Sequence, residues 1–217
     1  MVDRGWPIAM QIAREGYPFI LTAVLLALFA FVLGWKWLGL GLALFSLGFV
    51  GFFRDPERTP PKGDDLILSP ADGRIVGIRR HETAGGLEGG TQVSIFLSPL
   101  DVHVNRAPVK GRVEQVEYQK GRFLAAYKEQ ASQSNEQNML SIVDPRGRSL
   151  RLVQIAGVLA RRIVCYVKRG DGLERGQRFG LIMFGSRVDL FLPPDSKVEV
   201  VEGQKVRGGE TIVGRFS

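Results

Sequence analysis

Cysteine and histidine are almost missing from this sequence of 217 residues, which has one cysteine, Cys165, and two histidines. A single cysteine excludes an internal disulfide framework, and so few cysteine and histidine residues leave no ligand set with the spacing of a zinc site. Walker and Rossmann glycine motifs are absent as well. The sequence therefore predicts no metal, no nucleotide-binding loop and no disulfide-stabilised fold.

Acidic residues are in short supply too. The chain has 29 lysine and arginine residues against 22 aspartate and glutamate residues, a formal net charge of +7. Such a balance favours a partner with negative charge, either a nucleic acid or an anionic membrane. The basic pairs at 161–162 and 168–169 lack interleaved aromatic residues. We therefore expect contacts with acidic lipid headgroups and no nucleic-acid binding.

Charged residues are missing from two stretches near the N-terminus. Residues 16–35 contain none, residues 37–53 contain none, and only Lys36 separates these two runs rich in Leu, Phe and Gly. Each run is close to the ~17–25 residues that a membrane-spanning helix needs. The pattern predicts a two-helix transmembrane hairpin, with two buried helices of a soluble domain as the alternative.

Basic residues flank both ends of this predicted hairpin, and Lys36 alone lies in its turn. They are Arg4, Arg14, Arg54, Arg58 and Lys62. This distribution predicts that both ends lie on the cytoplasmic side of the cell membrane. Prolines at positions 56, 60 and 61 cannot continue a helix, so we predict a membrane hairpin with an exit linker at 1–62 and a cytoplasmic, β-rich catalytic domain at 63–217.

From residue 66 onward, short apolar runs alternate with Gly, Asp and Pro, a texture typical of a β-barrel or sandwich. The runs cover residues 93–97, 113–118, 140–143, 150–156, 161–167, 179–184, 188–192, 197–201 and 211–216. Two glycine turns, within 173–179 and 201–209, resemble each other and the hammerhead corners of biotinyl and lipoyl carrier domains. We therefore predict a mainly β fold, with a barrel-sandwich-hybrid-like domain after the helical hairpin.

Two loop-like clusters carry side chains suited to acid–base catalysis. Asp72 lies in the turn 69–73, where a carboxylate that only stabilises its own turn is the alternative. His103 lies in the segment 97–108, whereas the other histidine, His81, falls in a glycine-rich stretch. His103 is therefore the candidate imidazole base, and a structural histidine is the alternative.

A third cluster, Gly185 with Ser186, interrupts a β-rich run near the C-terminus. No Gly-x-Ser-x-Gly elbow surrounds Ser186, because Arg187 and Val188 follow it, so the α/β-hydrolase class is excluded. Taken alone, the pair is typical of a bulge between two strands.

Together these clusters resemble the phosphatidylserine decarboxylase family in its short, membrane-associated form. The matching pieces follow the family's order and are residues 53–56, 69–73, 98–108, 135–136, 157, 160–163 and 184–189. The resemblance implies a pyruvoyl-dependent lyase of phospholipid biosynthesis that converts phosphatidylserine to phosphatidylethanolamine.

The resemblance also implies a proenzyme that cuts itself between Gly185 and Ser186. The large and small chains would form a heterodimer, and Ser186 would become the covalent pyruvoyl cofactor, which forms a Schiff base with the substrate. His103 would serve as the base, oriented by Asp72, with Asp101 as a competing orienter. The candidate substrate-binding residues are Arg106, Arg187 and Asn135.

The sequence departs from the longer family members within their Asp-Tyr-His-Arg-x-His-x-Pro motif. Val102 replaces the tyrosine, and Arg106 stands where the second histidine would be. Whether His103 serves self-cleavage, decarboxylation or both therefore stays open, as does the oligomeric state. The alternative function is a membrane-tethered carrier or binding module, although no modifiable lysine at a hairpin tip is evident.

Overall fold

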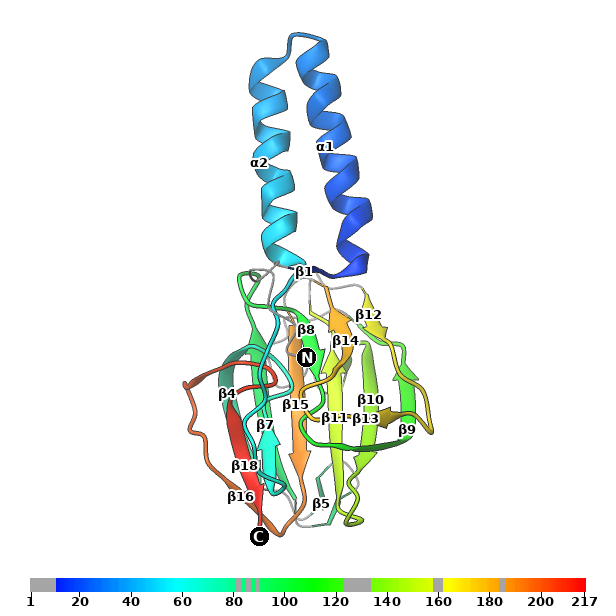
Figure 1. Ribbon diagram of the computed structural model, residues 1–217, viewed down its shortest axis with the longest axis vertical. Coiled ribbons are helices and arrows are strands. Elements are labelled where there is room, and N and C mark those ends of the chain that lie inside the picture. The colour runs from blue at the N-terminus through cyan, green and yellow to red at the C-terminus, as the bar shows by residue number, and fades with distance from the viewer. Residues whose placement is uncertain are drawn as a thin grey trace, which may run out of the picture. The chain divides into compact units, whose positions relative to one another are not determined.

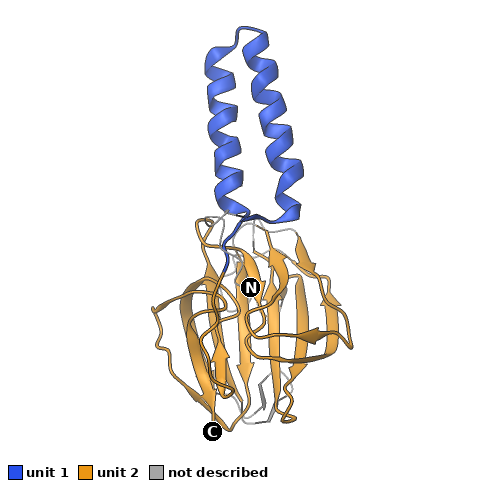
Figure 2. Cartoon of the chain, viewed as in Figure 1, with its two compact units in different colours: residues 1–57 blue, residues 58–217 orange. Residues whose placement is uncertain are grey.

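The computed structural model describes residues 11–80, 83–84, 87–88, 90–122, 134–157, 162–183 and 186–217. The chain divides into two compact units, residues 1–57 and 58–217 (Figure 2). The boundary predicted at residue 62 lies inside the second unit. The prediction of a mainly β protein with two N-terminal helices is confirmed.

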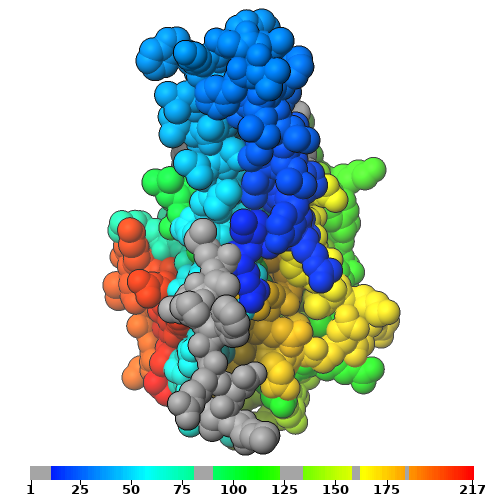
Figure 3. Space-filling model, turned by 45° about the horizontal axis from the view of Figure 1, so that its top comes forward, coloured from blue at the N-terminus to red at the C-terminus, as the bar shows by residue number. Residues whose placement is uncertain are grey.

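The first unit is a helical hairpin whose helices lie side by side (Figures 1 and 3). Helix α1 spans Tyr17–Val32, after the 3-10 turn η1 (Arg14–Gly16), and α2 spans Lys36–Phe52. Strands β1 (Gln11–Ile12) and β2 (Arg54–Asp55) pair antiparallel. Small residues lie buried between the helices, namely Ala23, Ala27, Ala30, Gly39 and Ser46. Their size lets the two backbones approach closely.

The second unit consists of β-strands. Their bounds are β3 Leu66–Leu68, β4 Gly73–Arg80, β5 Thr83–Ala84, β6 Leu87–Glu88, β7 Thr91–Leu97, β8 Val104–Arg106, β9 Gly111–Gln119, β10 Gln137–Val143, β11 Ser149–Ile155, β12 Ile163–Cys165, β13 Gly172–Leu173, β14 Arg178–Ile182, β15 Ser186–Leu192, β16 Ser196–Val198, β17 Lys205–Val206 and β18 Ile212–Phe216. An eight-stranded antiparallel sheet runs in the order β13-β9-β10-β11-β15-β7-β4-β17 and curls on itself (Figure 1). Two three-stranded sheets, β12-β14-β8 and β16-β18-β3, complete the unit apart from the β5-β6 pair.

The strand pairings reveal an internal duplication in this β unit. One half is β8 to β14, and the other half is β3, β4 and β7 followed by β15 to β18. At one edge of the large sheet Gly111 pairs with Leu173, and at the other edge Gly73 pairs with Val206. The large sheet therefore has quasi-two-fold symmetry about its central β11–β15 pair.

Hydrogen bonds between the halves repeat in the same way. Leu68 N–H donates to the Pro108 carbonyl at 2.9 Å, and Arg106 N–H donates to the Pro70 carbonyl at 2.8 Å. Residues 69–78 (SPADGRIVGI) align with residues 107–116 (APVKGRVEQV) at this register.

The repeat predicted from the glycine turns has the wrong register. The sequence suggests that Gly176 matches Gly203, but the hydrogen bonds make Gly170 equivalent to Gly203, and Gly176 equivalent to Gly209. All four glycines have a positive φ. Because the turns share this conformation, the glycine pattern alone cannot identify the equivalent pair.

The main core lies between the large sheet and the three-stranded sheets. Core-facing positions alternate along the strands, with Val188 and Leu190 on β15 and Leu150 and Leu152 on β11. Ile182 of β14 belongs to the same buried cluster. By this alternation, Ser186 on β15 and Gln154 on β11 also face the core.

The two halves differ at one corner. In the first half, β10 continues into β11 through a tight hairpin, and Val143 pairs with Ser149. At the equivalent corner of the other half, Phe96 of β7 pairs with Arg187 of β15, and Leu97 pairs with Ser186. Here β7 continues into β8, and β15 is entered from β14. Because β11 and β15 are antiparallel, the two corners lie at opposite ends of the large sheet (Figure 1).

Candidate active site

Ser186 is the first residue of β15 and is completely buried, with 0% exposure. Its Oγ has no hydrogen-bond partner among the residues that the structure describes. A buried hydroxyl without a partner costs about 1–3 kcal/mol of folding free energy, so its retention calls for a functional reason. Gly185, the other residue of the predicted cleavage site, lies outside the described residues.

His103 is also completely buried. Ile182 N–H donates to the His103 carbonyl at 3.3 Å, which extends the β8–β14 ladder and places the imidazole on the core-facing side with Ile182. The ring nitrogen Nδ1 lies 2.9 Å from the Asp101 carbonyl oxygen. Because a carbonyl only accepts, Nδ1 carries the hydrogen, and the lone pair of the neutral ring is on Nε2. His103 thus has the tautomer of a general base at Nε2.

Two chain connections bring His103 and Ser186 to the same end of the core. Ile182, which pairs with His103, precedes Ser186 by four residues. The Cα atoms of Ile182 and Ser186 are therefore at most about 14 Å apart. Leu97, which pairs with Ser186, precedes His103 by only six residues. A serine and an imidazole therefore face the same core from two different sheets.

Asp101 positions the imidazole through its main chain. Its carboxylate oxygen Oδ2 accepts from Ser98 N–H at 2.8 Å and from Ser98 Oγ at 2.7 Å. Asp101 N–H donates in return to the Ser98 carbonyl at 2.9 Å. These bonds lock the turn and hold the Asp101 carbonyl against Nδ1 of His103.

Asp72 makes a different set of contacts. Its Oδ2 forms an ion pair with Arg58 at 2.9 Å, and its Oδ1 accepts from Gly208 N–H at 2.7 Å. Arg58 also pairs with Glu210 at 2.9 Å. The role of Asp72 as the orienter of His103 stays a prediction, since His103 Nδ1 donates its hydrogen bond to the Asp101 carbonyl.

The three candidate substrate-binding residues differ in where they lie. Asn135 is buried, and its Nδ2 donates at 2.7 Å to the carbonyl of Ala156. Ala156 directly follows Ile155, the partner of Arg187, and is therefore the neighbour of Ser186 across the sheet. Asn135 thus contacts the backbone of the residue that lies across the sheet from Ser186.

The two arginines are held by other groups. Arg106 is buried, and its Nη1 donates to the Gly176 carbonyl at 3.1 Å. Arg187 forms an ion pair with Asp189 at 2.6 Å and donates to Ser94 Oγ at 2.8 Å. Because neighbouring residues on a strand point to opposite faces, Arg187 faces away from the Ser186 side of the sheet.

Three buried amides near Ser186 were not predicted as site residues: Asn105, Asn138 and Gln154. A signal for them was present in the sequence, because Gln154 takes a core-facing position between Leu152 and Ala156 in an apolar strand. Asn138 likewise precedes Leu140 and Ile142 at the core-facing spacing.

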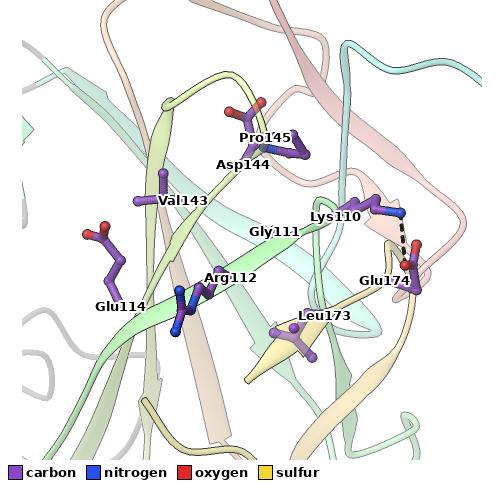
Figure 4. Close-up of a pocket in the computed structure, with 10 residues that line it drawn as sticks. Lys110, Gly111, Arg112, Glu114, Val143, Asp144, Pro145, Leu173 and Glu174 are labelled. Atoms are coloured by element: carbon purple, nitrogen blue, oxygen red, sulfur yellow. Dashed lines mark ion pairs between the residues drawn. The ribbon is translucent and has the colours of Figure 1, made fainter. Parts of the chain in front are cut away.

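A surface pocket of about 460 Å³ lies at the hairpin corner instead (Figure 4). Lys110 and Glu174 form an ion pair there at 2.9 Å. Its lining includes Asp144, Pro145 and Leu173 but none of the predicted site residues. This pocket is therefore separate from the candidate active site.

A buried serine and a buried imidazole thus lie at one end of the β core. The sequence model of the family described as phosphatidylserine decarboxylase matches residues 45–214. This chain belongs to the phosphatidylserine decarboxylase family, as the sequence predicts.

Named relatives cover nearly the whole chain. A phosphatidylserine decarboxylase proenzyme of Symbiobacterium thermophilum is 48% identical over 217 residues, 100% of this chain and 99% of the relative. Proteins of the same name from Geobacter metallireducens and Syntrophus aciditrophicus are 46% and 43% identical. The Geobacter match covers 94% of this chain and 95% of the relative, and the Syntrophus match covers 94% of this chain and 97% of the relative.

Proposed function

We propose that this chain is a proenzyme that cuts itself between Gly185 and Ser186 and then decarboxylates phosphatidylserine to phosphatidylethanolamine. The observation that carries the proposal is the buried Ser186 hydroxyl without a hydrogen-bond partner among the described residues, at the same end of the core as His103. A serine that only stabilised the fold would be expected to use its hydroxyl in a hydrogen bond. The word proenzyme in the names of the relatives fits this chemistry.

Self-cleavage needs only groups of the chain and water. His103 Nε2 accepts the proton of Ser186 Oγ, the oxygen bonds to the Gly185 carbonyl carbon, and the peptide C–N bond breaks as the amine takes up a proton. The peptide bond has then become an ester. Loss of the Ser186 Cα proton to a base expels the ester oxygen with the Gly185 carboxylate and leaves dehydroalanine. Water replaces its nitrogen, which departs as ammonia, and a ketone remains.

The pyruvoyl ketone supplies an electron sink for the loss of carbon dioxide from an amine substrate. The residues present fit such a group, because the position of Ser186 is buried between Leu97 and Ala156, away from bulk water. His103 Nε2 holds the proton that the product carbon receives. Asn135 and Arg106 are the proposed substrate-binding residues, whereas we assign Arg187 to holding β15 through Asp189.

The two product chains would stay together without a covalent link. Strands β15 to β18, which follow the cut, pair with β11, β7, β4 and β3, which precede it. Their core-facing residues belong to one buried cluster. We therefore expect a tight heterodimer of residues 1–185 and 186–217.

The helical hairpin is the proposed membrane anchor. One helical segment in the described part of the chain, Arg14–Val32 with 19 residues, is long and apolar enough to cross a membrane, and Lys36–Phe52 is a shorter apolar helix. Large apolar side chains on both helices are exposed, among them Leu25, Phe29, Leu44 and Leu47. A lipid environment would cover this apolar surface, with the basic flanks on the cytoplasmic side.

The β unit fits the barrel-sandwich-hybrid class. Its two halves share the eight-stranded sheet, and each half has glycine turns that hydrogen-bond within that half. Gly176 N–H donates to the Ala107 carbonyl, as Gly209 N–H donates to the Ser69 carbonyl, both at 2.8 Å. This repetition supports the predicted architecture.

The test is a decarboxylation assay on the membrane-inserted protein. Wild type in vesicles that contain carboxyl-labelled phosphatidylserine should release labelled carbon dioxide and form phosphatidylethanolamine, and Ser186→Ala should do neither. An intact, vesicle-bound wild-type protein that forms no product would overturn the proposal and favour the carrier or binding module.

A further inference from the structure

Three buried amides form a hydrogen-bonded chain across the core beside the candidate site. Asn138 Nδ2 of β10 donates to Gln154 Oε1 of β11 at 2.9 Å. Gln154 Nε2 donates in turn to Asn105 Oδ1 of β8 at 2.8 Å, a bond that crosses from the eight-stranded sheet to a three-stranded sheet. The chain ends at Asn105 Nδ2, which is completely buried and has no hydrogen-bond partner within the described ranges.

The amide chain lies one layer from the residues proposed to react. Asn105 follows His103 by two residues on the same face of β8, and Gln154 pairs with Val188, two residues after Ser186. Residues on the same face of a strand are about 6.5–7 Å apart along the chain. Asn105 and Gln154 therefore form the layer of the core next to His103 and Ser186.

A glycine leaves the room for this arrangement. Gly180 of β14 pairs with Asn105, and a Cβ built on it would lie 2.9 Å from Gln154 Nε2 and 2.4 Å from the Val164 carbonyl oxygen. A side chain at position 180 would therefore displace the amide that holds Asn105 Oδ1. With Oδ1 bound, the orientation of the Asn105 amide is fixed and its Nδ2 hydrogens remain as donors.

We propose that Asn105 Nδ2 is an oxyanion donor for self-cleavage. When Ser186 Oγ bonds to the Gly185 carbonyl carbon, the carbonyl oxygen becomes negatively charged, and Asn105 donates a hydrogen bond to it. Asn105 itself makes and breaks no covalent bond, while Gln154, which holds its Oδ1, is a positioning residue. The inference rests on the proposed function, because the oxyanion forms only if Ser186 attacks. A preorganised donor of this kind in a buried site typically changes a rate by about 10²–10³-fold.

The test follows conversion of the full-length chain, synthesised into lipid nanodiscs, by intact mass over time. Asn105→Leu keeps the approximate side-chain volume without a donor, so cleavage should be about 10²–10³-fold slower than in wild type. Asn138→Leu is the matched control, since it removes a buried amide from the far end of the chain while Gln154 still holds Asn105. It should cleave within a few-fold of wild type.

The variant Asn105→Asp tests whether position 105 acts as a hydrogen-bond donor or only supports the structure. An ionised carboxylate has no donor, whereas a protonated one regains an O–H donor, and burial favours the protonated form. The cleavage rate of this variant relative to wild type should therefore rise as the pH falls.

The outcomes are distinguishable. If wild type does not cleave, the proposed function fails. If wild type cleaves and folded Asn105→Leu cleaves equally fast, the oxyanion role is overturned while the function stands. Should Asn105→Leu not fold, a rate ratio of Asn105→Asp to wild type that does not change with pH would overturn the role.

Discussion

Val143 pairs with Ser149 at one corner of the β unit, and at the quasi-equivalent corner Phe96 pairs with Arg187, next to the Leu97–Ser186 pair. At the first corner a hairpin joins the strands, and the Asp144 carboxylate closes it by accepting from Arg148 N–H at 2.8 Å and Arg148 Nε at 2.7 Å. At the second corner no hairpin joins the paired strands, because β7 continues into β8 and β15 follows β14. Ser186 Oγ has no hydrogen-bond partner there among the described residues. Equivalent strand ends thus give a hydrogen-bonded turn in one half and a candidate reactive site in the other.

The ion pairs at equivalent positions of the two halves differ in how far they are exposed to solvent. Lys110 and Asp72 occupy equivalent positions of the aligned segments 107–116 and 69–78. The Lys110–Glu174 pair is exposed, with 61% and 71% of the side-chain surfaces accessible, whereas the Arg58–Asp72 pair has 10% and 14% accessible. At these equivalent positions, the charge is therefore buried in the half that contains Ser186 and exposed in the other half.

Loss of the His103 imidazole should have the largest effect on the rate of self-cleavage at Ser186. His103→Gln removes the proposed base, so self-cleavage should be about 10²–10⁴-fold slower, measured as the fraction of cleaved chain over time. The same substitution at His81, the other histidine of the chain, is the control and should cleave at the wild-type rate. Equal rates for all three proteins would contradict the assignment of His103.

The buried ion pair behind Ser186 should have the largest effect on stability. Arg187→Met leaves the Asp189 carboxylate, which is 1% exposed, without its cation, and should cost about 3–5 kcal/mol in the free energy of unfolding. Denaturant unfolding of the uncleaved Ser186→Ala background measures this cost. The double variant Arg187→Met, Asp189→Leu should recover much of it. A loss below about 1 kcal/mol in the single variant would show that the pair does not hold β15.

The equivalent charges at the two corners allow a direct comparison. Arg58→Met leaves the carboxylates of Asp72 and Glu210 without their shared cation, and should cost about 2 kcal/mol, because the pair is mostly buried. Lys110→Met at the exposed pair should cost less than about 1 kcal/mol. Equal costs in the same unfolding measurement would contradict the difference in burial between the two corners.

The hairpin corner should show the smallest effect, and one that depends on pH. Burial alone would raise the pKa of Asp144, but the hydrogen bonds from Arg148 and Arg146 and the charge of Arg148 hold it below its ordinary value. The ionised carboxylate therefore stabilises the fold above the ordinary pKa of about 3.9, and this stability is lost as the pH falls through the lowered pKa of the folded state.

Asp144→Asn should accordingly cost about 1–2 kcal/mol at pH 7, since it removes charge-assisted hydrogen bonds. The difference from wild type should narrow below about pH 4, as measured by unfolding at a series of pH values. A difference that stays constant down to pH 2 would rule out the ionised carboxylate as its source.

Much of the fold follows from the sequence because apolar residues recur at alternate positions in the central strands, as in β11 and β15. The runs at 150–156 and 188–192 coincide with β11 and β15, and the two uncharged runs coincide with α1 and α2. The family, with Ser186 and His103 as candidate residues, follows from motifs that are local in the sequence.

Features that depend on long-range register could not be predicted. The duplication joins segments 38 residues apart, such as Gly73 and Gly111, through pairing that a short glycine turn does not determine. The burial of Arg187 against Asp189 follows from strand alternation only once Ser186 is known to face the core. The Asn138–Gln154–Asn105 chain links three strands, so no local motif reveals it.

Intact-mass analysis of the membrane fraction tests the central claim most directly, on wild type, Ser186→Ala and the control Ser149→Ala, a serine of the hairpin corner. We predict two chains in wild type and in Ser149→Ala, with the smaller chain beginning at a blocked, hydrazine-reactive residue 186. Ser186→Ala should give one full-length chain. A single full-length chain in catalytically active wild type would contradict the account.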